Sequence, residues 1–399
     1  MSQRRRGSPG LRRLLRTTKR RRFIWFVALV LVVLLWWASD SLRQLLSPWE
    51  WSWPQNAYRT RLPVPRRVPE QYHIPRDTHD QVNSTRRANA ALVMLARNYE
   101  LAAVLAAMKQ VEDRFNKRHH YPWVLLNEVP FSKSFIQATK AITDAEVVHG
   151  KIENEEWFQP DWIDEDKAEA GRLRMDKDRI LFAKSVAYRN MCRFNSGFFF
   201  SNKFLRPYRW YWRIEPGIEY FCDVNDDPFL YLEDNGKSYG FVMSMYENPA
   251  TMPSLWNLAK DFAKANPGLI ATDNAMKFIS RDGGETYNQC QFYSNFEIAD
   301  MDFWRGEAYQ KFFKFIDDSG GFYYERWSDA PVHTIALALL ANRSALHFFD
   351  DIGYRHPPYQ HCPQGDARLK NRCSCLPGET FDDNRFSCLK HFRTTMEAS

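Results

Sequence analysis

The feature that most limits how this 399-residue chain can fold is an uncharged apolar run preceded by a strongly basic arm. Residues 1–22 contain ten Lys and Arg and no acidic residue, and residues 23–38 read FIWFVALVLVVLLWWA. A helix of these sixteen residues would be about 24 Å long, near the minimum for spanning a bilayer. We therefore expect a cytosolic tail (1–22), a signal-anchor transmembrane helix (23–39) and a lumenal remainder.

The rest of the chain carries little net charge. The formal charge of +7 comes from 55 Lys and Arg against 48 Asp and Glu, and without the ten cations of the tail the balance is −3. The basic character therefore belongs to a short segment. This removes the main support for a nucleic-acid-binding surface, and we expect no nucleic-acid partner.

Two other interpretations of the N-terminus are a cleaved signal peptide and a buried core helix. The sequence WWASDS offers only a weak cleavage site, and ten cations before the apolar run argue against a core helix. A lumenal, oxidising compartment agrees with seven cysteines. Two N-glycosylation sequons lie at residues 83–85 and 342–344, and the apolar flanks of the second predict partial burial.

The lumenal part divides into a stem and a folded domain. Residues 40–87 contain six prolines between positions 48 and 75, which exclude long helices and favour an extended spacer. Residues 88–399 form the predicted catalytic domain, with a Cys-rich tail at 362–399.

The start of this domain has an α/β pattern. Residues 88–117 are rich in good helix formers, residues 123–126 form an apolar run after Pro122, and a second helix is expected from near Ser132. This order favours a doubly wound sheet, in which ligands bind beyond the carboxyl ends of strands. Asn127 and Glu128 lie at such an end. Further along, we expect helices over 161–184 and 254–267 and a strand in 239–246.

Aromatic residues are concentrated between residues 188 and 256, where 18 of 69 positions are Phe, Trp or Tyr. One interpretation is an aromatic-rich core. The other is a sugar site, because the C–H faces of sugars stack on rings while neighbouring Asn, Asp and Arg bind the hydroxyls. Both can hold at once.

Two acidic positions are candidates for a divalent-cation site. Asp300 and Asp302 form an Asp-x-Asp, which is equally typical of a solvated turn. Glu215 follows the strand-like sequence WYWRI and precedes Pro216. Hard cations that bind pyrophosphate use one or two carboxylates together with phosphate oxygens.

Four longer stretches identify a family resemblance. RWYWRIEPGIEYFCDVNDDPF, YNQCQFYSNFEIADMDFWR, YYERWSDAPVHTIALALL and GYRHPPYQHCP resemble the fungal Golgi α-1,2-mannosyltransferases of the family-15 glycosyltransferases, the glycolipid 2-alpha-mannosyltransferase type. The resemblance runs from about residue 124 to residue 390. It implies a GT-A-like α/β fold with a mixed, mostly parallel sheet, GDP-mannose as donor, Mn²⁺ as cofactor and retention of the α configuration. The implied acceptors are mannose-ended N- or O-linked glycans of secreted and cell-wall proteins, and the implied location is the Golgi membrane, crossed by one helix.

The same resemblance implies roles for individual residues. Glu297 corresponds to the nucleophile or stabiliser of an oxocarbenium ion, Asp329 to an acid near the acceptor, and Tyr188 to a catalytic-site tyrosine. The remaining implied site residues are His356 as metal ligand, Glu215 as metal and donor ligand, and Glu247 at the donor site.

Several of these residues have plain structural alternatives. Glu297 could pair with Arg305, and Asp329 could cap the helix that follows it. Arg193, placed in the donor site, and Arg213 could hold phosphates or stack on aromatic rings.

The cysteine pattern favours disulfides over zinc. Cys373-Ser-Cys375 is tighter than the Cys-x-x-Cys of zinc sites, so we expect two disulfides among the four C-terminal cysteines, with three connectivities open. Cys192, Cys222 and Cys290 then leave an odd thiol. Either Cys192 pairs with Cys290 or all three are buried and free.

Two other function classes compete with a transferase. A lumenal glycan-binding protein would keep the aromatics and lose the acids, whereas this chain has Glu215, Glu297, Asp329 and His356 together. A hydrolase with paired carboxylates would need neither nucleotide nor metal. The sequence leaves open the N- or O-glycan acceptor, the position of the mannose added, the nucleophilic or front-face mechanism and the oligomeric state.

Overall fold

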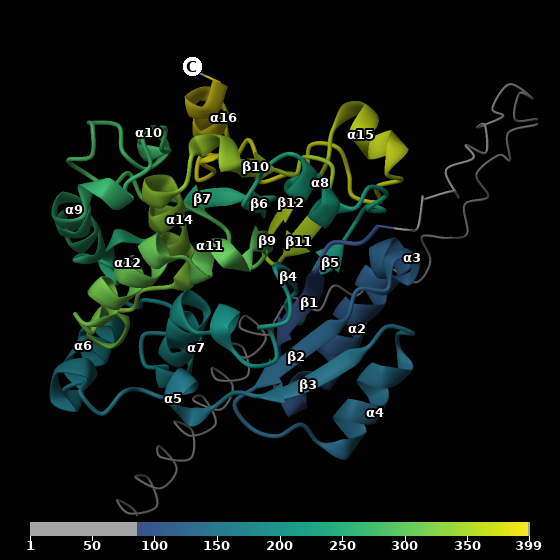
Figure 1. Ribbon diagram of the computed structural model, residues 1–399, viewed down its shortest axis with the longest axis horizontal. Coiled ribbons are helices and arrows are strands. Elements are labelled where there is room, and N and C mark those ends of the chain that lie inside the picture. Colours follow the sequence, from purple (N-terminus) through teal and green to yellow (C-terminus); the bar gives the residue numbers. More distant parts are fainter. Residues whose placement is uncertain (1–85, 398–399) are drawn as a thin grey trace, which may run out of the picture. The chain divides into compact units, whose positions relative to one another are not determined.

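The computed structural model describes residues 86–397 (Figure 1). The predicted tail, the predicted membrane helix, the first sequon and nearly all of the predicted stem lie outside these residues. Within 86–397, no helix is both long enough and apolar enough to cross a bilayer.

A seven-stranded sheet forms the centre of the described chain. Its strands, in spatial order, are β10 (Leu346–Phe348), β6 (Tyr239–Phe241), β9 (Glu297–Asp300), β4 (Trp210–Arg213), β1 (Ala90–Leu95), β2 (Trp123–Asn127) and β3 (Val147–Lys151). Only β9 runs antiparallel to its neighbours, so the predicted mixed, mostly parallel sheet is confirmed.

The predicted helix over 88–117 is wrong in its first third. Residues 90–95 form β1, which pairs with both β2 and β4 and is almost fully buried. Helical structure begins later, with η1 (Asn98–Glu100), α2 (Leu101–Val111), the π turn η2 (Glu112–Asn116) and α3 (Lys117–His119). The composition of residues 90–95 suits a helix, but a strand buried on both faces is set by its lateral pairing rather than by propensity.

Other predicted elements agree more closely with the structure. The apolar run at 123–126 lies in β2, and Ser132 caps α4 (Lys133–Ala141) by accepting from the backbone N–H of Phe135. The expected helix at 161–184 is shorter, α6 (Glu165–Lys177), and that at 254–267 is α9 (Leu255–Ala265). The expected strand at 239–246 is two strands, because β6 ends before β7 (Ser244–Tyr246).

The remaining elements surround this sheet. β7 pairs with β8 (Cys290–Phe292), and β5 (Glu219–Tyr220), β11 (Tyr354–His356) and β12 (Tyr359–His361) form a small third sheet. The other helices are α5 (Asn154–Trp157), α7 (Val186–Gly197), α8 (Pro228–Asp234), α10 (Met276–Ile279), α11 (Met301–Arg305), α12 (Glu307–Asp317), α13 (Gly321–Tyr324), α14 (Asp329–Leu340), α15 (Gly365–Lys370) and α16 (Leu389–Glu397), with 3-10 turns η3 (Phe199–Ser201), η4 (Pro249–Thr251), η5 (Pro267–Leu269) and η6 (Arg343–Ala345).

Two apolar clusters lie on opposite faces of the central sheet. Along β1, Ala91 and Val93 belong to one cluster and Leu92 and Met94 to the other, as strand alternation requires. Helices α2 and α4 cover one face, and α7, α12 and α14 cover the other (Figure 1). The aromatic segment of β4, residues 210–212, is fully buried between them, so much of the aromatic-rich stretch is core.

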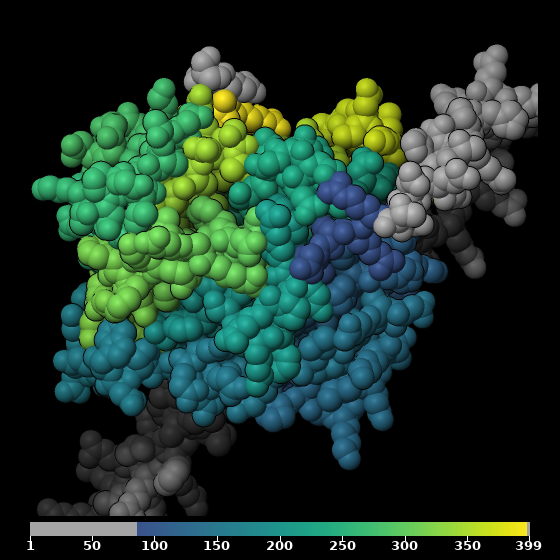
Figure 2. All heavy atoms as spheres, viewed as in Figure 1, coloured from purple at the N-terminus to yellow at the C-terminus, as the bar shows by residue number. Residues whose placement is uncertain are grey.

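On the face shown in Figure 2, blue residues lie along the lower part and green residues of later helices lie above them at the left, with teal residues between. Asn342 of the second sequon is exposed in the turn after α14, contrary to the predicted partial burial.

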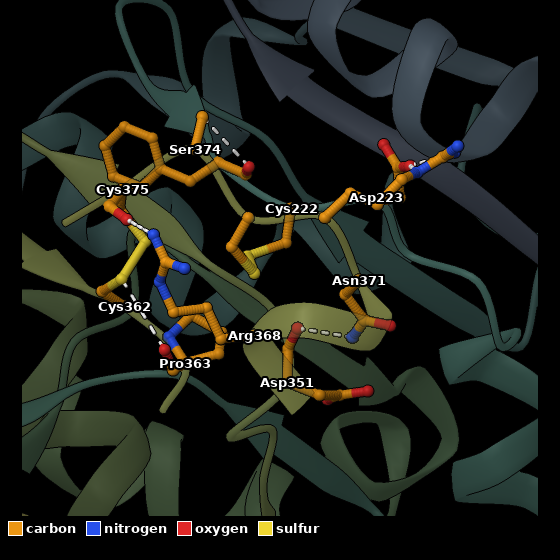
Figure 3. Close-up of a disulfide and its surroundings, with 12 residues drawn as sticks. Cys222, Asp223, Asp351, Cys362, Pro363, Arg368, Asn371, Ser374 and Cys375 are labelled. Atoms are coloured by element: carbon orange, nitrogen blue, oxygen red, sulfur yellow. Dashed lines mark hydrogen bonds and ion pairs between the residues drawn. A yellow bond between two sulfur atoms is a disulfide. The ribbon is translucent and has the colours of Figure 1, made fainter. Parts of the chain in front are cut away.

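Three disulfides correct the expected pairing. Only Cys362–Cys375 joins two of the C-terminal cysteines, whereas Cys373 pairs with Cys222 and Cys388 pairs with Cys290. Figure 3 shows the first two of these bridges close together, where Asn371 hydrogen-bonds to the backbone carbonyl of Asp351. The bridges with sequence separations of 151 and 98 residues therefore fasten the tail to earlier parts of the described chain. Cys192 is the odd thiol and is buried.

This pairing predicts the result of thiol labelling. Under non-reducing conditions, maleimide should add once per chain, at Cys192, and only after denaturation, because burial keeps that thiol from solvent. Peptide mass mapping should recover the three cross-linked pairs. Labelling of the native protein, or a cross-link between two of the C-terminal cysteines other than Cys362–Cys375, would contradict the assignment.

Candidate active site

The candidate site lies where β4 ends and β9 begins. These strands are antiparallel, and their register pairs Arg213 with Glu297. A pocket opens beside this pair at the carboxyl ends of β1, β2 and β4, and its lining consists of Val93, Leu95, Leu126, Phe194, Asn195, Phe199, Tyr211, Arg213 and Glu297. This is the end of a parallel sheet at which α/β proteins bind ligands.

Arg213 contacts three carboxylates. Its Nε and Nη2 atoms donate to Oε1 of Glu215 at 3.0 and 2.6 Å, and its Nη1 donates to Oδ2 of Asp329. The same Nη1 lies 3.8 Å from Oε1 of Glu297. The four side chains are between 1% and 21% exposed, so these charges are largely shielded from water.

Glu297 is held on its other side by two buried groups. Tyr239 donates its hydroxyl to Oε2 at 3.1 Å, and Nδ1 of His333 lies 3.1 Å from the same oxygen. Burial raises the pKa of Tyr239 well above its usual value, so this hydroxyl keeps its proton. On its other side, Nε2 of His333 lies 3.1 Å from the backbone carbonyl oxygen of Asn195.

The structure shows neither a Glu297–Arg305 ion pair nor a helix cap formed by the Asp329 side chain. Arg305 donates to the backbone carbonyls of Phe200, Leu205 and Tyr208, not to Glu297. Asp329 is the first residue of α14, and its carboxylate accepts from Ser294 and Arg213 instead of capping the helix.

Glu215 and His356 form a second part of the site. Nε2 of His356 lies 3.3 Å from Oε2 of Glu215, and Asn295 donates to the same oxygen at 2.6 Å. Burial by itself would raise the pKa of Glu215, but Arg213 and His356 outweigh it and lower the pKa to about 2. Tyr293 contacts Nδ1 of His356 at 3.1 Å.

This pair has the donor chemistry for a manganese ion. Carboxylate oxygen suits Mn²⁺, imidazole nitrogen is a common ligand of divalent transition metals, and Nε2 of His356 lies 3.3 Å from Oε2 of Glu215. No group of three or more His, Cys, Asp or Glu side chains with metal-binding geometry occurs within residues 86–397. A cation held by two protein ligands would take its other ligands from phosphate and water oxygens.

Glu247 and Tyr188 lie together beside the segment that carries Asp329. Oε2 of Glu247 accepts from Ser328, the neighbour of Asp329, at 3.0 Å. The Arg326 guanidinium lies 3.8 Å from Oε1 of Glu247 and 5.2 Å from the centre of the Tyr188 ring. The structure therefore brings these two predicted residues into one group with the segment that carries Asp329.

Other candidates have different surroundings. Arg193, expected at the donor, makes a buried two-point ion pair with Asp317, with N–O distances of 2.8 Å, so its phosphate-binding role finds no support in this arrangement. Asp300 is buried at the end of β9, where it caps α11 and pairs with Arg209, whereas Asp302 is exposed, so the interpretation as a solvated turn fits Asp302 and not Asp300. At the end of β2, Asn127 is fully buried and Glu128 accepts from Arg97.

The fold and the site together define an α/β glycosyltransferase. The sequence profile of the glycolipid 2-alpha-mannosyltransferases matches residues 55–397, and the chain belongs to this family. Among its relatives, glycolipid 2-alpha-mannosyltransferase 2 of Candida albicans is 48% identical over 307 residues, which cover 77% of this chain and 67% of that protein. O-glycoside alpha-1,2-mannosyltransferase omh1 of Schizosaccharomyces pombe is 45% identical over 312 residues, 78% of this chain and 80% of that protein.

Two solved structures have the same fold. Core-mannan synthase A from Aspergillus fumigatus, in an Mn/GDP form, has a TM-score of 0.70 and 39% identity, and the match covers 74% of this chain and 80% of that one. The mannosyltransferase Ktr4p from Saccharomyces cerevisiae, in complex with GDP, has a TM-score of 0.75 and 35% identity, covering 78% of this chain and 83% of that one. The predicted family is confirmed.

The sequence did not reveal the residues that hold the site together. The sequence makes Arg213 a candidate for binding phosphates or stacking on aromatic rings, not for pairing with carboxylates, and it gives no signal for Tyr239, His333 or Asn295. The only available signal was that Arg213 lies two residues before Glu215, within a strand otherwise made of aromatic residues.

We predict that Arg213→Met lowers the free energy of unfolding by about 3–5 kcal/mol, because it leaves three carboxylates without their shared cation. Arg355→Met is the matched control, since Arg355 is 39% exposed and its partner Glu219 is 43% exposed. That variant should lose at most about 1 kcal/mol. Urea unfolding of both variants measures the difference, and equal losses would refute the central role of Arg213.

Proposed function

We propose that this chain transfers mannose from GDP-mannose to the 2-hydroxyl of a mannose-ended glycan, with retention of the α configuration. The observation that carries the proposal is the buried Glu297, which faces the pocket beside Arg213 and Asp329. Membership of a mannosyltransferase family and the GDP in two related structures support the donor. We also propose that the domain is of the GT-A class.

The donor would occupy the pocket at the ends of β1, β2 and β4. Val93, Leu95 and Leu126 supply apolar walls there, and Arg213 and Glu297 supply charge at its inner side. We propose Mn²⁺ as the cofactor, with His356 and Glu215 as its protein ligands. When bound, such a cation neutralises charge on the departing diphosphate.

Glu297 would face the positive charge that develops on the sugar as GDP leaves. Its Oε2 is occupied by Tyr239 and His333, which leaves Oε1 directed toward Arg213 and the pocket. Retention requires either covalent attack by this carboxylate, followed by a second inversion, or departure and attack on one face of the sugar. In both mechanisms a fixed negative charge in a site with little water stabilises the transition state.

Asp329 would orient and deprotonate the accepting hydroxyl. It is 5% exposed and is held by Arg213 and Ser294, so its carboxylate has a fixed position at the start of α14. Tyr188 and Glu247 lie beside the same segment and would line the acceptor side.

We further propose a single-pass type II anchor in the Golgi membrane. The support is the order of the N-terminal sequence, with the basic residues 1–22 before the apolar run at 23–38. The acceptor would then be a mannosylated glycoprotein in the lumen. The three disulfides of the described domain agree with an oxidising compartment.

The test is mannosyl transfer by residues 86–399, produced in a secretory host and supplied with GDP-mannose, Mn²⁺ and methyl α-mannoside. NMR of the product should show an α-1,2-linked dimannoside. Glu297→Gln should lower kcat by at least about 10²-fold, because it removes the carboxylate charge while keeping the side-chain shape. Glu219→Gln, in an exposed ion pair with Arg355, is the matched control and should stay near the wild type. GDP binding without transfer, or a β-linked product, would contradict the proposal.

A second prediction concerns the metal. Tyr293→Phe removes the hydroxyl that contacts Nδ1 of His356, so the orientation of the imidazole ring is no longer fixed by that contact. Loss of such an outer partner weakens metal affinity by about 10- to 100-fold. The Mn²⁺ concentration for half-maximal activity should therefore rise, while activity at saturating Mn²⁺ largely returns. An unchanged Mn²⁺ dependence would remove His356 from the proposed ligand pair.

A further inference from the structure

We propose that Phe182 forms an outer acceptor subsite, in which its exposed ring face stacks on the sugar that precedes the accepting mannose. This inference rests on the proposed mannosyl transfer. Phe182 lies in the loop 178–185, between α6 and α7.

The Phe182 ring packs on the ring of Tyr188. Their centres are 4.6 Å apart and their planes differ by 14°, which is a stacked arrangement. Phe182 nevertheless remains 49% exposed, and its neighbour Leu181 is 72% exposed. The Tyr188 contact therefore accounts for only part of the Phe182 ring surface, and the rest is open to a ligand.

A continuous line of contacts connects this ring to the proposed catalytic group. The Arg326 guanidinium lies 5.2 Å from the centre of the Tyr188 ring, and Nη2 of Arg326 lies 3.8 Å from Oε1 of Glu247. Glu247 in turn accepts from Ser328, next to Asp329. Phe182 is the outermost and most exposed member of this line, and the proposed sugar would therefore bind one ring beyond Tyr188.

The backbone at Phe182 has an unfavourable conformation that the fold maintains. Its φ is 60°, in the left-handed region, which costs a residue with a side chain about 1–2 kcal/mol. Arg189 is fully buried and holds the loop, since its Nη1 donates to the carbonyls of Ala183 at 2.8 Å and Ser185 at 3.1 Å. Its Nε donates to the carbonyl of Glu325 at 3.0 Å, which joins the loop to the segment before Asp329.

A pyranose suits such a ring. The C–H face of mannose is apolar and flat enough to stack on an aromatic side chain, while its hydroxyls remain hydrated. Because the Phe182 ring is already stacked on Tyr188, it would lose little conformational entropy when a sugar binds. The geometry thus favours a glycan of at least two mannose residues over a single mannose.

The test measures kcat/KM for two acceptors, mannobiose and methyl α-mannoside, and takes the ratio of the mannobiose value to the methyl α-mannoside value. In Phe182→Ala this ratio should fall about two- to tenfold, the range expected for one stacking contact. Phe182→Tyr should restore it. Phe182→Gly removes the ring but suits the positive φ, so it should lose the same preference without losing stability.

Leu181→Ala is the matched control, because it shortens the neighbouring exposed side chain and should leave the ratio unchanged. A ratio that does not respond to Phe182→Ala, or that falls equally in Leu181→Ala, would overturn the inference while leaving mannosyl transfer intact. If the wild type transfers no mannose, the proposed function fails. The subsite is then read from saturation-transfer NMR of mannobiose, whose signals should weaken in Phe182→Gly and whose persistence would overturn it.

Discussion

The arrangement of the site depends on one guanidinium group. Arg213 is only 12% exposed and contacts Glu215, Asp329 and Glu297, which come from the end of β4, the start of α14 and the start of β9. Buried carboxylates repel one another and lose their hydration, so three of them can share a small volume only with a cation among them. The planar fork of arginine can direct separate N–H groups at separate carboxylates, which a lysine cannot do.

This constraint connects the sheet to the proposed chemistry. The antiparallel pairing of β4 and β9 places Arg213 opposite Glu297, and the parallel strands beside them leave the pocket at their carboxyl ends. Tyr239 and His333 then fix one oxygen of Glu297, while Ser294 fixes Asp329. The carboxylates are thereby held in place before any substrate arrives, which is the condition for electrostatic stabilisation of a transition state.

The parts of the fold that could be predicted are those with local signals. The strand at 123–127 is a continuous apolar run after Pro122, and Ser132 is a standard helix cap. Residues 90–95 show the limit, because Ala, Leu and Met favour a helix and only pairing with β2 and β4 makes them a strand. Cys222–Cys373 could not be predicted either, since 151 residues separate its partners. Likewise His333 lies in the mostly apolar sequence of α14, where a histidine is indistinguishable from a core residue until Glu297 is placed beside it.

The most direct test of this account is a crystal structure with Mn²⁺ and an unreactive analogue of GDP-mannose. The account predicts that the anomeric carbon lies about 3.5 Å from a carboxylate oxygen of Glu297, the separation of a reactive pair. It also predicts that the diphosphate lies beside His356. A sugar bound away from Glu297, with Arg213 and its carboxylates remote from the anomeric carbon, would contradict the account.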